Sequence, residues 1–210
     1  LKIEEFMFIP CTMRNINQTL RVDFIRCYNP KIIICTNGAQ IYIDGKLDEI
    51  WDKQMKALCD KNELNRNIKY LEKLKEEYKE LIGIIEVRNI EDFYITVKCV
   101  DSHEADKLYN IISNSFDKNI NVLKIEAKIF IIHNRINKVY AVDYIIEKFN
   151  IKKLITSGDT EVDREFTSRG ISILPKHSSF KHEKAIITEK SKIHATEEIP
   201  LKSINAHIST

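Results

Sequence analysis

The sequence predicts an α/β fold at both ends of the chain and an α+β unit between them. Near the start, residues 6–11 and 32–36 form almost continuous apolar runs, as expected of parallel strands covered on both faces. Residues 138–174 alternate between helical and strand patterns, which is typical of the same architecture. The middle of the chain instead groups its expected helices and strands, which indicates an antiparallel sheet with its helices on one face.

The first part of the chain, residues 6–45, is expected to form a strand, a helix, a second strand and a turn. The helix is predicted over 15–28, where apolar residues recur on one side and Asn15 can cap the first turn. Asn29-Pro30 ends that helix, because the residue before a proline is pushed out of the helical region. Asp44-Gly45 then predicts a tight hairpin.

The middle part reads helix, helix, strand, strand, helix, strand, strand. These elements are expected over 47–60, 64–82, 84–87, 93–100, 105–116, 121–126 and 128–133. Residues 128–133 are expected to be the last strand of this part, and residues 128–135 are expected to run back into the core. The last part is expected to contain helix 138–149, strand 152–156, helix 161–169, strand 171–174, the apolar segment 185–188 and a short helix over 196–204.

The composition is that of an ordinary globular protein without an electrostatic target. The chain has 210 residues, 43% of them hydrophobic and 30% charged, and its net charge is +2, which gives no basis for nucleic acid or an anionic membrane as a partner. Its apolar runs are far shorter than the roughly 20 residues of a membrane helix. Five widely spaced cysteines without a C-x-x-C pair favour a reducing, cytoplasmic location.

The segment Ser157-Gly158-Asp159-Thr160-Glu161-Val162-Asp163 is the strongest chemical signal. It joins an apolar run to an amphipathic segment and places two carboxylates four residues apart behind a glycine. Mg²⁺ prefers oxygen ligands and keeps several waters, so one or two carboxylates and a substrate phosphate can hold it. An Asx-type turn that caps the following helix is the alternative interpretation of the same residues.

Three further segments stand in order with this one. Pro10-Cys11-Thr12-Met13-Arg14 ends the first apolar run, Asn37-Gly38-Ala39 ends the second, and Lys138 opens a helix about twenty residues before the Gly-Asp turn. The ordered set resembles the haloacid dehalogenase-like phosphatase superfamily, in its sugar-phosphatase-like branch with a large α/β cap. The resemblance implies a Rossmann-like core of residues 1–45 and 127–210, with an α+β cap domain inserted at 46–126.

The resemblance also implies roles for single residues. Asp159 would be a direct Mg²⁺ ligand and Asp163 a second one, direct or through water. Lys138 would bond both the phosphate and the nucleophilic carboxylate, and the hydroxyl and backbone N–H of Thr12 would hold a phosphate oxygen. The histidines form no metal-binding pattern, although His177 could lie near the rim of the site.

Substrate contacts are less determined. Arg14 could bind substrate or pair with an acid of the core. Asn37 could bind substrate or simply belong to a turn at positive φ. Specificity would fall to the cap, where Arg88, Tyr94 and Lys98 lie near the expected strands and nothing selects among them.

The family's first motif, D-x-D-x-T, supplies the nucleophilic aspartate, and no D-x-D occurs in the 210 residues. The chain begins with Leu1, and residues 1–5 resemble the end of a helix. The nucleophile is therefore expected outside these residues, in a segment containing the first strand of the core. The predicted activity is Mg²⁺-dependent hydrolysis of a small phosphorylated metabolite, such as a sugar phosphate, through an aspartyl-phosphate. The alternative is a catalytically inert binding or regulatory domain of the same fold.

Overall fold

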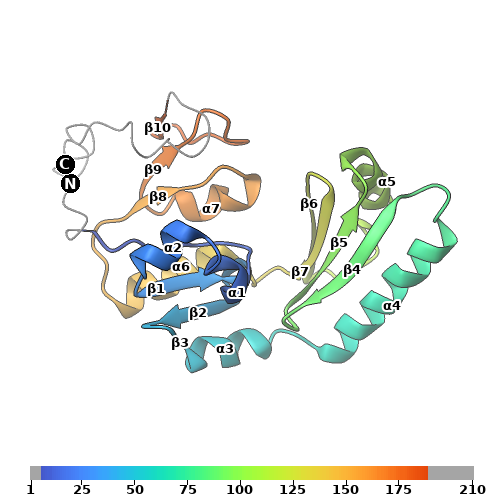
Figure 1. Ribbon diagram of the computed structural model, residues 1–210, viewed down its shortest axis with the longest axis horizontal. Coiled ribbons are helices and arrows are strands. Elements are labelled where there is room, and N and C mark those ends of the chain that lie inside the picture. The colour runs from blue at the N-terminus through green and yellow to red at the C-terminus, as the bar shows by residue number, and fades with distance from the viewer. Residues whose placement is uncertain (1–5, 189–210) are drawn as a thin grey trace. The chain divides into compact units, whose positions relative to one another are not determined.

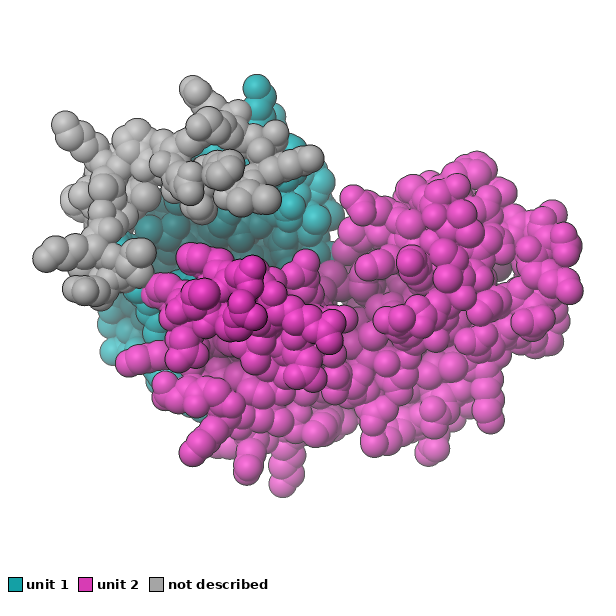
Figure 2. Space-filling view, in the orientation of Figure 1, with its two compact units in different colours: residues 1–8, 138–210 teal, residues 9–137 magenta. Residues whose placement is uncertain are grey.

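The computed structural model describes residues 6–188 and is shown in Figure 1. The helix expected over 196–204 lies outside the described residues. The chain divides into two compact units, residues 9–137 and a second unit made of residues 1–8 and 138–210 (Figure 2). The predicted limits of core and cap, at 1–45, 46–126 and 127–210, stay a prediction, because a compact unit need not coincide with an inserted or interrupted domain.

The unit of residues 9–137 begins with short helices and a three-stranded sheet. Its helices α1 and α2 span Ile16–Thr19 and Asp23–Tyr28, its strands β1, β2 and β3 span Ile32–Cys35, Gln40–Ile43 and Lys46–Leu47, and the 3-10 turn η2 spans Thr36–Gly38. The strands pair antiparallel in the order β1-β2-β3. The predicted hairpin is confirmed, with Asp44 and Gly45 at φ of 48° and 75°.

The single helix expected over 15–28 is wrong, because the chain breaks into α1 and α2. Asn15 and Gln18 form a capping box around a helix of only four residues, and Val22 is extended at φ −75° and ψ 115°. None of the residues in α2 is buried. Without packing along one face, little favours a continuous helix over two short ones.

The buried strand expected over 6–11 is also wrong for most of its length. Phe6, Met7 and Phe8 are exposed and lie outside any strand. The strand pairing recorded in this segment is the single parallel bridge between Cys11 and Ile34. An apolar run forms a buried strand only where another strand pairs with it. Here the pairing with β1 begins only at Pro10 and Cys11.

The rest of this unit is a four-stranded antiparallel sheet with helices. Helices α3, α4 and α5 span Glu49–Lys56, Lys61–Glu77 and Ser102–Ile112, and strands β4, β5, β6 and β7 span Ile84–Ile90, Tyr94–Cys99, Ile120–Ile125 and Lys128–His133. The sheet order is β4-β5-β7-β6. β7 pairs with β5 and β6, which confirms residues 128–133 as the last strand of the middle part, and the expectation that residues 128–135 run back into the core is wrong for β7.

One apolar cluster fills the space between this sheet and its helices. Leu71 and Leu74 of α4 and Ala105, Leu108 and Ile112 of α5 line this space from the helix side. They face odd-numbered residues of the sheet, which are Ile95, Val97 and Cys99 of β5 and Ile129 and Ile131 of β7. Because side chains alternate along a strand, the even-numbered residues of β5 and β7 point to the opposite face. The α+β character predicted for the middle of the chain is confirmed.

The second unit carries a small parallel sheet. It comprises α6 at Lys138–Lys148, β8 at Ile155–Ser157, the 3-10 turn η3 at Glu161–Asp163, α7 at Arg164–Thr167, β9 at Ile171–Leu174 and β10 at Ile186–Ile187. The strands run parallel in the order β10-β9-β8. This confirms the α/β alternation predicted for the last part. Among residues 6–188, no helix has the length and apolar character needed to cross a membrane.

Candidate active site

A buried ion pair joins the start of α6 to the loop after β8. Nζ of Lys138, the first residue of α6, lies 2.5 Å from Oδ1 of Asp163, and both side chains are only 7% exposed. Nζ also lies 5.7 Å from the centroid of the Phe166 ring. Two of the predicted site residues, which are 25 positions apart in the sequence, are thus in direct contact. A charge this deeply buried is tolerated because it is paired and hydrogen-bonded.

The second carboxylate oxygen of Asp163 organises the Gly-Asp loop. Oδ2 accepts hydrogen bonds from the backbone N–H of Asp159 at 3.3 Å, from the N–H of Thr160 at 3.2 Å and from the Thr160 hydroxyl at 2.9 Å. A Cβ added to Gly158 would stand 2.4 Å from Cβ of Asp163, so the glycine is what allows this approach. Asp163 therefore caps the turn, as the alternative interpretation of this segment expected, and it also pairs with Lys138.

Asp159 presents a different environment from Asp163. Its side chain is 53% exposed, and its Oδ2 lies 3.6 Å from Nε2 of His177. The backbone carbonyl of Asp159 accepts a hydrogen bond from the N–H of Ser179 at 2.9 Å, which fastens the Gly-Asp loop to the loop after β9. The same loop thus holds one buried, fully bonded carboxylate and one that is open to a ligand.

These residues fit a hard divalent cation, although they do not form a preassembled cage. Within residues 6–188, no group of three or more His, Cys, Asp or Glu side chains is placed to hold a metal ion. Mg²⁺ needs only one or two carboxylates when waters and a phosphate complete its shell. The exposed Asp159 suits direct ligation, while both oxygens of Asp163 already accept hydrogen bonds. Asp163 therefore suits a contact through water.

The buried hydroxyls of Thr156 and Thr167 connect the Gly-Asp loop to its flanking strand and helix. The Thr167 hydroxyl donates to the carbonyl of Asp163 at 2.8 Å and lies 2.8 Å from Nε2 of His182. The Thr156 hydroxyl donates to the carbonyl of Thr167 at 2.6 Å. Since Thr156 belongs to β8, these bonds tie the helix that follows the loop back to the strand that precedes it.

In the other unit, the segment around Thr12 runs beside β1. The N–H of Ile34 donates to the carbonyl of Pro10 at 2.8 Å, and the N–H of Thr12 donates to the carbonyl of Ile34 at 3.0 Å. The expectation that the backbone N–H of Thr12 binds phosphate is therefore wrong, because that donor is already used within the sheet. The Thr12 hydroxyl accepts from the N–H of Arg14 at 3.2 Å, which leaves its own proton to donate. The Arg14 side chain belongs to an exposed residue.

The turn after β1 holds three consecutive residues at positive φ. Thr36, Asn37 and Gly38 have φ of 53°, 56° and 90°. Such a value is a strained conformation for a β-branched residue such as Thr36. The N–H groups of Thr36 and Asn37 donate to the carbonyls of Arg14 and Thr12, at 2.8 and 3.1 Å, and hold the turn against the Thr12 segment. Strain of this kind clusters at functional sites.

Asn37 has one acceptor to spare. Its Nδ2 donates to the carbonyl of Ile136 at 3.1 Å, whereas its Oδ1 is buried and has no hydrogen-bond partner among the described residues. An unpaired buried acceptor carries a free-energy cost that a bound donor would remove. The positive φ agrees with the interpretation of Asn37 as a turn residue, and its binding of substrate stays a prediction.

Two of the cysteines are poor candidates for a thiol nucleophile. Burial raises the pKa of Cys35 to about 12 and that of Cys59 to about 11, so both are protonated at neutral pH.

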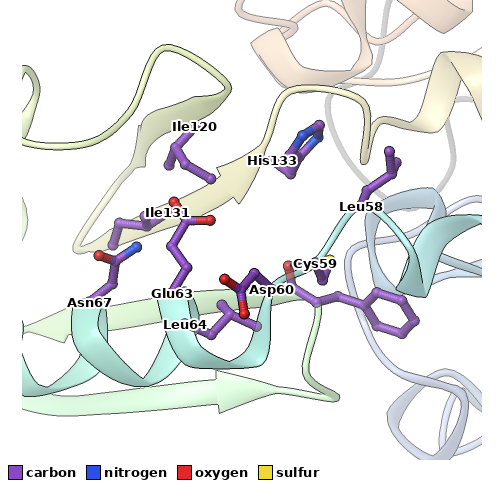
Figure 3. A pocket seen from close by; sticks show the side chains of 10 residues that line it. Leu58, Cys59, Asp60, Glu63, Leu64, Asn67, Ile120, Ile131 and His133 are labelled. Carbon is purple, nitrogen blue, oxygen red and sulfur yellow. Dashed lines mark hydrogen bonds between the residues drawn. The ribbon is translucent and has the colours of Figure 1, made fainter.

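Cys59 lines a small cavity of about 20 Å³ beside α4, shown in Figure 3 with Glu63, His133 and their neighbours. That volume suits about one water. The pKa of His133 is lowered, mainly by burial and to a smaller extent by the nearby positive charge of Arg135. The cavity contains none of the predicted site residues.

Comparison with known proteins gives a result for the fold. No family model matches the sequence, and no curated protein matches it either. Among solved structures, the chain is similar to the sucrose-phosphatase of Synechocystis sp. PCC6803, with a TM-score of 0.67 and 13% identity over 98% of this chain and 86% of that one. A protein related to trehalose-6-phosphate phosphatase gives a TM-score of 0.62 and 15% identity over 99% and 85%. A haloacid dehalogenase-like hydrolase from Bacteroides thetaiotaomicron gives 0.53 and 13% over 86% and 80%.

The chain has the haloacid dehalogenase-like fold. The predicted fold class, an α/β Rossmann-like core with an α+β cap, is confirmed by this similarity. At these identities the likeness concerns the fold alone. The roles of Thr12, Arg14, Asn37, Lys138, Asp159 and Asp163 stay predictions that the geometry above can support.

His177 is the site neighbour to which sequence reasoning gave too little weight. It follows β9, and β9 pairs in parallel with β8, whose end carries Asp159. The carboxyl ends of neighbouring parallel strands lie at the same edge of a sheet, which is where ligands bind in open α/β folds. The parallel pairing of two consecutive strands was thus a signal that could have placed His177 beside Asp159.

Proposed function

We propose that this chain carries the phosphate- and metal-binding part of a Mg²⁺-dependent phosphatase that acts on a small phosphorylated metabolite, such as a sugar phosphate. The observation that carries the proposal is the buried Lys138–Asp163 pair beneath the exposed carboxylate of Asp159. A lysine buried at a helix start, fixed by one carboxylate and adjacent to a second, open one, is more than a solvated surface charge. Phosphoryl transfer depends mostly on such positioning and charge stabilisation.

Lys138 has capacity left for a substrate. An ammonium group has three N–H donors, and the structure records one hydrogen bond from Nζ, to Asp163. The remaining donors can bond a phosphate oxygen and the attacking carboxylate. Asp163 holds Nζ in place and, through Oδ2, holds the backbone of Asp159 as well. Mg²⁺ bound by Asp159, with Asp163 contacted through water, would neutralise charge on the phosphate oxygens.

In the unit of residues 9–137, Thr12 and Asn37 are further candidates for contacts with a substrate. Thr12 has a hydroxyl proton to donate, and Asn37 has a buried acceptor available to a substrate hydroxyl. Arg14 is the candidate for a contact with the rest of the substrate. The class of substrate is suggested by the similar structures, one of which is a sucrose-phosphatase bound to sucrose and phosphate.

The reaction requires a carboxylate in line with the phosphorus. An aspartate from a D-x-D-x-T segment would attack it, the ester oxygen would leave with a proton from a general acid, and water would then hydrolyse the aspartyl-phosphate. These 210 residues contain no D-x-D. This absence is also the observation that favours the second candidate, an inert domain that binds phosphorylated ligands without turning them over.

Activity measurements separate the two candidates. The 210-residue chain is assayed with a generic phosphate ester and Mg²⁺, first alone and then joined to an upstream segment that contains D-x-D-x-T. We expect turnover only in the joined form, and the Asp159→Asn variant of that form should lose it. Inactivity of both forms would favour the inert domain, and rapid turnover by the 210-residue chain alone would refute the proposed mechanism.

A further inference from the structure

A histidine follows β9 at the same edge of the sheet where Asp159 follows β8. The two strands pair in parallel, with Ser157 opposite Ile173, so their carboxyl ends lie together (Figure 1). Asp159 comes two residues after the end of β8, and His177 comes three residues after the end of β9. All of these residues belong to one compact unit, 138–210 with 1–8. The two side chains can therefore serve one site without a contribution from the other unit.

The distance between the two side chains fits a shared ion better than a direct contact. Nε2 of His177 and Oδ2 of Asp159 are 3.6 Å apart, which is too long for a hydrogen bond. In the same unit, the half-exposed pair of Arg169 and Asp143 closes to 2.8 Å. Two ligand atoms that are each about 2.1 Å from one ion lie about 3.4 Å apart at the tetrahedral angle. A tetrahedral ion thus fits between these two atoms with little movement of either side chain.

Both ligand atoms are accessible. The side chains of His177 and Asp159 are 40% and 53% exposed, and their mutual contact is the one side-chain ion pair or hydrogen bond recorded for either within residues 6–188. Asp163 differs, because its two carboxylate oxygens already accept hydrogen bonds. His177 and Asp159 are therefore the pair that can bind an ion directly, without breaking a contact inside the protein.

The backbone holds the two side chains in place relative to each other. The N–H of Ser179 donates to the carbonyl of Asp159 at 2.9 Å, and the N–H of Ser178 donates to the carbonyl of Pro175 at 2.9 Å, which closes the turn that contains His177. Phe180, only 3% exposed, anchors the next residue of this loop in the core. Ligands presented from such a fixed backbone lose little conformational freedom when they bind.

We propose that His177 is, through Nε2, a direct ligand of the cation held by Asp159, and that this site binds Zn²⁺ more tightly than Mg²⁺. Mg²⁺ prefers oxygen ligands, whereas Zn²⁺ takes imidazole nitrogen and carboxylate oxygen together. Mg²⁺ occupies the site through Asp159 and waters, and the imidazole adds affinity for the zinc class of ion. The inference rests on the proposed function in one respect, the role of Asp159 as a metal ligand.

The test is a calorimetric titration of the 210-residue chain, with Zn²⁺ and separately with Mg²⁺. It is run at pH 7.5, because metal ligation requires a neutral imidazole. The variants are His177→Ala and Asp159→Asn, and the matched control is His103→Ala, which removes an exposed histidine from α5 in the other unit. Amide chemical shifts establish that each variant keeps its fold. Zinc bound elsewhere, for example at cysteines, is common to all four proteins and cancels in the comparison.

We expect His177→Ala to weaken Zn²⁺ binding about tenfold or more, since losing even an outer-shell partner of a metal ligand costs roughly 10- to 100-fold. Its Mg²⁺ affinity should stay that of the parent chain. Asp159→Asn should weaken the binding of both ions, and His103→Ala should change neither. In nuclear magnetic resonance spectra of the parent chain, Zn²⁺ should shift the ring nitrogen signal of His177 Nε2.

The inference is overturned if His177→Ala leaves Zn²⁺ affinity unchanged. It is also overturned if that variant weakens both ions equally, since His177 would then support the loop without binding the ion, or if His177-dependent zinc binding persists in Asp159→Asn.

Failure of the proposed function gives a different result. If zinc binding depends on both residues but the chain joined to a D-x-D-x-T segment shows no turnover, the proposed function fails and the metal ligands stand. If the joined form turns over its substrate and His177→Ala leaves Zn²⁺ affinity unchanged, the assignment of His177 fails alone.

Discussion

Replacing Lys138 by methionine tests the ion pair that supports the candidate site. The change keeps an unbranched apolar stem but leaves the Asp163 carboxylate, only 7% exposed, without its cation. Removing one partner of a buried pair costs about 3–5 kcal/mol. Asp163 retains three hydrogen bonds from the Gly-Asp loop, so we expect the low end of that range, about 3 kcal/mol. For a chain of this size the melting temperature should fall by roughly 6–12 °C.

The assay is urea unfolding followed by circular dichroism, with the double variant Lys138→Met/Asp163→Asn as the matched control. An asparagine keeps an acceptor for the loop donors but needs no cation. The double variant should therefore recover more than about 1 kcal/mol relative to Lys138→Met, and the single variant Asp163→Asn completes a double-mutant cycle that gives the coupling between the two sites. A Lys138→Met chain within about 0.5 kcal/mol of the parent, the range of an ordinary surface substitution, would refute the reasoning.

Three further outcomes follow from the same geometry. Gly158→Ala should displace the Asp163 side chain, because the added Cβ would stand 2.4 Å from Cβ of Asp163, and differential scanning calorimetry should show a lower melting temperature. Asp159→Asn should change stability by less than about 0.5 kcal/mol, since the side chain is 53% exposed, while Mg²⁺ affinity measured by calorimetry should fall sharply. At pH 8 iodoacetamide should leave Cys35 unmodified, as its pKa is about 12, and should label the exposed Cys27, which mass spectrometry of the peptides distinguishes.

Local signals in the sequence predicted several elements well. The strand expected over 171–174 is β9, and the strand expected over 128–133 is β7, with the same bounds. Both are short apolar runs between clear breaks in the pattern. The hairpin at Asp44-Gly45 followed from turn chemistry, because both residues have positive φ.

What the sequence could not predict depends on neighbours in space. The run at 6–11 has the composition of a buried strand, but Phe6 to Phe8 are exposed. The bounds of β7 were predictable, yet its place between β5 and β6 was not, because strand order is set by long-range packing.

The candidate site shows the same division. The Gly-Asp motif and Lys138 were identifiable as residues in a pattern. In the folded chain, one carboxylate oxygen of Asp163 accepts from Lys138 and the other accepts from the Gly-Asp loop. These contacts, and the position of His177 beside Asp159, could not be predicted from the sequence. The backbone N–H of Thr12 could not be excluded as a phosphate donor until its bond to Ile34 was seen.

The central claim is that Asp159 holds a divalent cation beside a bound phosphate. Mn²⁺ takes the same oxygen ligands as Mg²⁺ and broadens nearby amide signals in nuclear magnetic resonance spectra. With inorganic phosphate present, substoichiometric Mn²⁺ should broaden the amides of Asp159 and Thr160 in the parent chain and neither of them in the Asp159→Asn variant. Equal broadening in the two proteins, or amides of Asp159 and Thr160 that stay sharp in the parent chain, would contradict the account.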